Sequence, residues 1–111
     1  MNLRIVVIGL SVTSSWGNGH ATTYRALIEA LARRGHRVTF LERDVSWYRN
    51  HRDLTRPGSW NVELYHSLKE IPGRFGQLIQ TADLVMIGSY VPDGIAISEW
   101  VTSHARGVTA F

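Results

Sequence analysis

The fold is decided by residues 3–20, which read LRIVVIGLSVTSSWGNGH. Residues 3–9 are rich in β-branched side chains, as is typical of a strand that is buried on both faces. A polar loop with glycines at positions 17 and 19 follows, and apolar residues then recur at helical spacing up to residue 31. This order of strand, loop and helix places the loop at the carboxyl end of a strand, where open α/β sheets bind ligands.

The first helix is bounded by recognisable end residues. Asn18 is a good helix cap, so the sequence predicts that the helix begins at Gly19 and His20. Gly35 suits the left-handed position just after a helix end. Residues 37–42 alternate and are rich in β-branched side chains, which predicts a second strand, parallel to the first.

The remaining elements repeat this alternation of strands and helices. A long polar connection, residues 43–60, contains Pro57-Gly58, and the pair Pro72-Gly73 predicts a turn. Strands are expected at residues 61–65, 84–88 and 107–111, and helices at residues 74–81 and 95–104. The pattern predicts a three-layer α/β fold, with a parallel sheet covered by helices on both faces.

Composition is that of one globular domain spanning residues 1–111. The chain is 44% hydrophobic and 19% charged, and it contains no cysteine, which excludes disulfides and thiolate chemistry. Its N-terminus lacks the features of a secretory signal, so a cytoplasmic location is expected. Because the predicted last strand stops in mid-element, we expect the domain to be truncated at its C-terminal end. The free strand edge would then favour self-association.

The loop after the first predicted strand, residues 10–18, carries the candidate chemistry together with the start of the helix. Gly17, Asn18 and Gly19 would let a ligand approach free N–H groups, or the glycines would only turn the chain. The G-x-G-x-x-G and phosphate-loop patterns are both absent from this loop. His20 is a candidate general base, and its alternative role is a hydrogen bond within the loop.

Acidic side chains follow two of the predicted strands. Glu42 and Asp44 follow the second strand and Asp93 follows the strand at residues 84–88, so any of them could orient His20. Glu42 could instead bind ribose or sugar hydroxyls, as the acid that ends the second strand does in nucleotide-binding folds. Each carboxylate could also be only a cap or a solvated charge. No metal site is expected.

Aromatic residues lie in the same loops. Trp16 is either a lid over the site or a plug into the core, and Tyr90 lies in the loop at residues 89–94. Trp47 and Tyr48 could stack on a sugar or a base, with neighbouring arginines meeting phosphate. Alternatively, the segment is an amphipathic helix with Trp47 packed inward. Arg25 is expected to be a surface charge.

Several motifs together resemble one family of enzymes. They are residues 16–25 (WGNGHATTYR), 34–36 (RGH), 38–40 (VTF), 41–44 (LERD) and 47–48 (WY). This set resembles the Rossmann-like N-terminal domain of two-domain (GT-B) glycosyltransferases, and within them the group related to spore-maturation proteins. The resemblance spans essentially the whole chain, although the first half carries the specific motifs.

The resemblance implies that this domain mainly holds the acceptor, a glycan or a small molecule. His20 matches the position of the acceptor base in one branch of these enzymes. The nucleotide-sugar donor is a substrate, bound mainly by a missing C-terminal domain, and no resident cofactor is implied. The isolated chain is therefore expected to be inactive.

Two other functions stay open from the residues alone. The chain could be a nucleotide- or cofactor-binding module that transfers no sugar, using the same loop and Glu42. Nucleic-acid binding through residues 43–53 is the least favoured interpretation, because the formal net charge is only +3.

Overall fold

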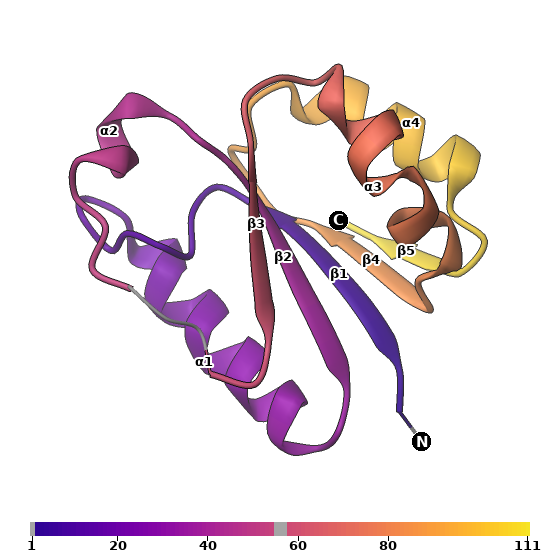
Figure 1. The fold of residues 1–111 in the computed structure, drawn as a ribbon, viewed down its shortest axis with the longest axis horizontal. Helices are drawn as coiled ribbons and strands as arrows, with labels where there is room; N and C mark the ends of the chain where they lie inside the picture. Colours follow the sequence, from indigo (N-terminus) through magenta and orange to yellow (C-terminus); the bar gives the residue numbers. More distant parts are fainter. Residues whose placement is uncertain (1, 55–57) are drawn as a thin grey trace.

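The computed structural model describes residues 2–54 and 58–111. In this part of the chain, parallel strands alternate with helices and form a Rossmann-like α/β fold (Figure 1). The elements are, in order, β1 (Arg4–Gly9), α1 (Gly19–Arg33), β2 (Arg37–Arg43), α2 (Ser46–Arg49), β3 (Asn61–Tyr65), α3 (Glu70–Thr81), β4 (Leu84–Ile87), α4 (Gly94–His104) and β5 (Val108–Ala110). The predicted three-layer fold is confirmed, and most element ends lie within one residue of prediction.

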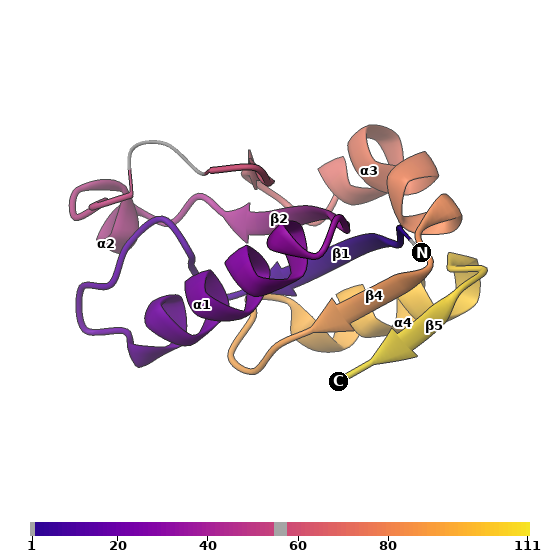
Figure 2. The same cartoon turned by 90° about the horizontal axis from the view of Figure 1, so that it is seen from below.

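The sheet has the strand order β3-β2-β1-β4-β5. The chain builds outward from β1 to β3 and then returns to place β4 against the other side of β1. β1 and β4 are neighbouring strands, and the loops that follow them lead to helices on opposite faces of the sheet (Figures 1 and 2). The place where these two loops separate is a switch point, and open α/β sheets bind ligands there. Gly88, just after β4, donates its N–H to the Ile8 carbonyl at 2.9 Å and so holds the two strand ends together.

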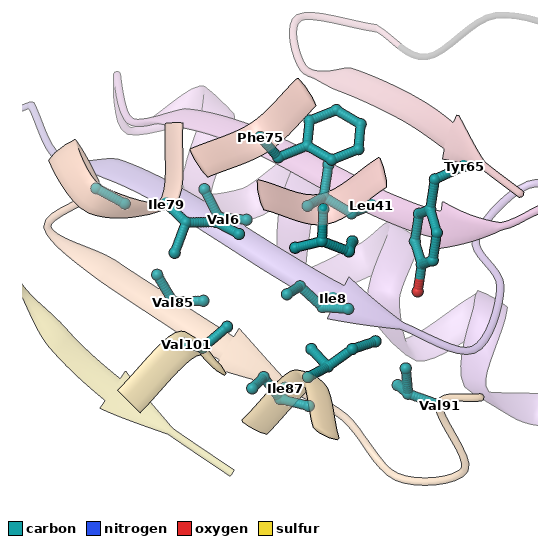
Figure 3. Close-up of a cluster of buried hydrophobic side chains, with 13 residues drawn as sticks. Val6, Ile8, Leu41, Tyr65, Phe75, Ile79, Val85, Ile87, Val91 and Val101 are labelled. Carbon is teal, nitrogen blue, oxygen red and sulfur yellow. The ribbon is translucent and has the colours of Figure 1, made fainter. Parts of the chain in front are cut away.

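Side chains alternate between the two faces of the sheet, and each face has its own core. Val6 and Ile8 of β1 belong to the cluster that packs against α3 and α4 (Figure 3). Ile5 and Val7 belong to the cluster that packs against α1. Figures 1 and 2 show α1 on one side of the sheet and α3 with α4 on the other. Helices on both faces explain why β1 reads as a continuous apolar run.

Helix α1 has the two ends that the sequence predicts. The Asn18 side chain accepts a hydrogen bond from the His20 N–H at 2.9 Å, and so caps the first turn. At the other end Gly35 has φ +91°. The N–H groups of Gly35 and His36 donate to the carbonyls of Ala32 and Leu31, which completes a Schellman motif. None of the described helices has the length and hydrophobicity needed to cross a bilayer.

Helix α3 begins earlier than predicted. The expected turn at Pro72-Gly73 is wrong, because both residues lie inside the helix, which starts at Glu70. Proline is tolerated in a first turn, where its missing N–H would have no helical partner in any case. The Glu70 carboxylate accepts from the backbone N–H groups of His66 and Ser67 and stabilises this early start.

The connection between β2 and β3 contains the short helix α2. The alternative in which Trp47 packs inward is wrong: Tyr48 is the buried residue, and 58% of Trp47 is exposed. Adjacent side chains of an α-helix are separated by about 100° around its axis, so only one of the two aromatic residues reaches the core. Pro57, which the sequence places in this connection, lies outside the described residues.

The described sheet has edges at β3 and β5. Beside the β5 edge, Val108 and Phe111 are both largely exposed. Unpaired edges of this kind can pair with other chains. Self-association thus stays a prediction, with β5 as the more apolar of the two edges.

Candidate functional site

A crevice opens at the switch point between the ends of β1 and β4. It has a volume of about 530 Å³ and is lined by Gly19, His20, Thr23, Tyr24, Gly88 and Ser89. The first four residues belong to the start of α1, and the last two belong to the loop after β4. The crevice therefore lies where the topology favours a ligand, with one wall from a helix and one from a loop.

His20 stands in this crevice without a hydrogen-bonding partner for its ring among the described residues. Its backbone N–H is held by Asn18, and its ring centroid lies 5.7 Å from that of Tyr90 and 6.3 Å from that of Tyr24. Tyr90 is 80% exposed and has φ +64°, in the left-handed region. A ring with both nitrogens unengaged by the protein can accept a proton from a ligand hydroxyl.

The carboxylates that the sequence offers as partners for His20 are held elsewhere. Asp93 pairs with Arg43 at 2.7 Å. Asp44 pairs with Arg52 at 2.9 Å and with Arg49 at 3.2 Å. Burial alone would raise the pKa of Asp44, but hydrogen bonds and charge from the two arginines outweigh it and lower that pKa. No carboxylate therefore orients His20 in the part of the chain that the structure describes.

Glu42 is fully buried and faces the β1–α1 loop instead of the solvent. Its carboxylate accepts hydrogen bonds from the N–H groups of Val12 and Thr13 at 2.7 and 3.0 Å, and from the Thr13 hydroxyl at 2.6 Å. Arg52 donates to the same hydroxyl at 2.9 Å. In this arrangement Glu42 holds the loop's backbone, and its oxygens are occupied by the protein.

A second, more exposed carboxylate holds the other half of the loop. Asp53 accepts hydrogen bonds from the hydroxyl and the N–H of Ser15, and from Arg25 at 2.6 Å. Arg25 also donates to the Val12 carbonyl at 2.8 Å. The expectation that Arg25 is only a surface charge is therefore wrong. The Ser15 hydrogen bond, followed by Arg25, lowers the pKa of Asp53 to about 2.

This Asp53 contact predicts a pH-dependent contribution to stability. Since folding lowers the pKa, the contribution is complete above the unfolded pKa of about 3.9 and is lost as pH falls through about 2. The side chain is half exposed, so solvent screening reduces the size of the effect. Urea unfolding of Asp53→Asn should show a shallower loss of stability between these pH values than the parent. Equal slopes for the two proteins would contradict the assignment.

Tyr24 is a crevice residue that sequence reasoning missed. Its helical spacing places it in the core, and it does contact Phe40, at a centroid distance of 5.1 Å. Its hydroxyl, however, extends to Gly88, where a Cβ atom would overlap it. Burial raises the pKa of Tyr24, so this hydroxyl stays protonated and can donate to a ligand. Glycine at the ends of both β1 and β4 is the sequence feature that could have indicated this space.

Substitution of Gly88 by alanine should displace Tyr24. The overlap predicts a loss of about 1–3 kcal/mol in the free energy of unfolding, as in other overpacked sites. The same substitution should cost less in a Tyr24→Phe background, because the overlapping oxygen is gone. Gly76→Ala is the matched control: the nearest side-chain atom would lie 3.9 Å away, and alanine favours the helix. Equal costs in both backgrounds would refute the contact.

The other predicted site residues lie along the loop that leads to the crevice. Gly17 has φ +56° within a turn that the Asn18 N–H closes on the Ser15 carbonyl. Gly19 opens α1 and lines the crevice. Trp16 is neither a core plug nor a crevice wall: it is 52% exposed and stacks on His51. The structure thus gathers His20 and Gly19 in the crevice, and Trp16 with Trp47 around His51.

Comparison of the chain with protein-family models, with curated proteins and with solved structures gives no match. The fold and the geometry of the crevice are therefore the basis for any functional conclusion.

Proposed function

We propose that this chain is the acceptor-binding domain of a nucleotide-sugar-dependent glycosyltransferase. The observation that carries the proposal is the imidazole of His20, which stands in the switch-point crevice with no described side chain hydrogen-bonded to it. The motif resemblance in residues 16–48 supports the same assignment. The proposal places the donor mainly on a second domain, which is not among these 111 residues.

In an inverting transfer, His20 has a direct chemical task. Neutral imidazole takes the proton of the acceptor hydroxyl while that oxygen forms a bond to the anomeric carbon of the donor sugar. The bond from that carbon to phosphate breaks, and the nucleoside diphosphate leaves with the electron pair. In a retaining transfer, the same ring would only hold the acceptor hydroxyl.

The hydroxyls beside His20 suit an acceptor rich in hydroxyl groups. Tyr24 and Thr23 line the helix wall of the crevice, and Ser89 lines the loop wall. Each of these side chains can both donate and accept a hydrogen bond, as sugar hydroxyls do. Among the residues that the structure describes, the crevice lining contains no lysine or arginine, so phosphate finds no cationic partner in that lining.

The alternative, a nucleotide- or cofactor-binding module, is disfavoured by the position of Glu42. Ribose recognition in such folds needs the acid at the end of β2 to face the ligand. Here that carboxylate is fully buried and bound to the loop. Nucleic-acid binding is disfavoured by the pairing of Arg43, Arg49 and Arg52 with carboxylates.

Titration of the 111-residue chain separates these functions. Amide resonances of residues 19–24 and 88–90 would be followed by NMR while NAD, UDP-glucose and four neutral tetrasaccharides are added in turn. The proposal expects shifts with at least one tetrasaccharide and little response to NAD. Saturable binding of NAD at these residues would favour the cofactor module instead. The requirement for His20 in catalysis is a separate test.

A further inference from the structure

Three aromatic side chains form one exposed stack, which we call the aromatic platform: Trp16 from the loop after β1, and Trp47 and His51 from α2 and the turn that follows it. The ring of His51 lies 4.4 Å from that of Trp16 and 5.9 Å from that of Trp47, with interplanar angles of 24° and 29°. Both tryptophans are more than half exposed. The flat apolar faces of the two indole rings are therefore partly open to solvent, beside the loop that leads to His20.

The platform is held in place by hydrogen bonds beneath it. The buried hydroxyl of Ser14 donates to the His51 carbonyl at 2.7 Å and accepts from the Trp16 N–H at 3.2 Å. The His51 Nδ1–H donates to the Trp47 carbonyl at 2.9 Å. The backbone under all three rings is thus tied together, and a ligand would meet a preformed surface.

The charges around the platform indicate which ligand suits it. Arg49 and Arg52 both pair with Asp44, and Arg52 also donates to Thr13. These two arginines are already partnered, so a nucleotide's phosphate would have to compete with Asp44 for them. An uncharged ligand with one apolar face fits this environment better than a nucleotide does.

We propose that the aromatic platform binds a neutral sugar ring of the acceptor, next to the residue that enters the reaction. This inference rests on the proposed function and names its acceptor as a saccharide with at least two sugar units. The C–H face of a pyranose carries a slight positive charge, and aromatic faces are negative, so the two stack with their hydroxyls left at the edge. Residues 16–20 connect the platform to the crevice, so one glycan could occupy both.

The indole N–H resonances of the 111-residue chain provide the test. Cellotetraose, maltotetraose, mannotetraose and tetra-N-acetylchitotetraose are the probes, and sorbitol serves as a polyol without a ring. At least one tetrasaccharide should shift the indole resonances of Trp16 and Trp47, whereas sorbitol should not. Trp100, which stacks on His104 on α4, is an internal control whose resonance should stay unchanged.

Variants then assign the binding to the platform. Trp16→Ala and Trp47→Ala should each weaken the binding of the tetrasaccharide by about tenfold, which corresponds to the loss of one aromatic contact. Ile95→Ala is the matched control, because it removes an apolar side chain that is even more exposed than the two tryptophans but lies on α4. Overturning results would be no shift with any tetrasaccharide, equal shifts at Trp100, or a response of the two tryptophans to UMP or oligothymidylate alone.

Failure of this inference is distinguishable from failure of the proposed function. If sugar transfer by the protein with its donor domain needs His20, but Trp16→Ala leaves the acceptor KM unchanged, the platform proposal alone is overturned. If the tetrasaccharide binds the platform but no nucleotide sugar is consumed, with or without His20, the platform proposal is supported and the transferase assignment is overturned.

Discussion

Replacement of Glu42 by leucine is expected to lower the free energy of unfolding by about 3–5 kcal/mol. Leucine has a similar size but offers no acceptor to the N–H groups of Val12 and Thr13, which then stay buried and unpaired. Each buried donor without a partner costs about 1–3 kcal/mol, and the Thr13 hydroxyl loses its acceptor as well. An apolar side chain also excludes the water that could replace the carboxylate.

Urea unfolding of three variants separates this role from a general loss of charge. Glu42→Gln keeps an acceptor oxygen and should lose about half as much stability as Glu42→Leu. Glu63→Gln is the matched control on the adjacent strand β3, where an exposed carboxylate lies 3.6 Å from Arg74. Its effect should stay below about 0.5 kcal/mol. A Glu42→Leu protein as stable as the control variant would show that the loop does not depend on this carboxylate.

The fold was largely predictable because its determinants are local. Asn18 and Gly35 bound the first helix through hydrogen bonds between residues at most five positions apart, and residues 5–8 of β1 form one unbroken apolar run. The error at Pro72 has a local cause too. Proline followed by glycine is typical of a turn, but the carboxylate of Glu70 stabilises a helix start that includes both residues.

The site was less predictable because its contacts join distant residues. The loop is held by Glu42 and Asp53, which lie about 30 to 40 positions after the groups they bind, and no spacing rule connects them. An acid at the end of β2 is typical of ribose binding, and only its burial shows that it faces the loop. Tyr24 has the spacing of a core residue, and its crevice role depends on a missing side chain at Gly88.

Under the proposed function, His20→Gln is expected to reduce kcat/KM for sugar transfer by at least about 100-fold in a protein that also carries the proposed donor domain. Glutamine can hydrogen-bond an acceptor hydroxyl but cannot take its proton at neutral pH. The fold should be unaffected, because the cap of α1 uses the backbone N–H of residue 20 and no described residue hydrogen-bonds the imidazole. Nucleoside diphosphate release from a panel of nucleotide sugars, with and without saccharide acceptors, measures the rate.

A pH profile separates a base from a residue that only positions the acceptor. Under the proposed function, a general base must be unprotonated, so transfer should slow on the acidic side of the profile, and this dependence should disappear in His20→Gln because glutamine cannot act as a base. His104→Gln is the matched control, since that histidine is exposed and bonded to its own helix on α4. Transfer by His20→Gln within about threefold of the parent, or an unchanged acidic limb, would assign His20 to hydroxyl binding alone.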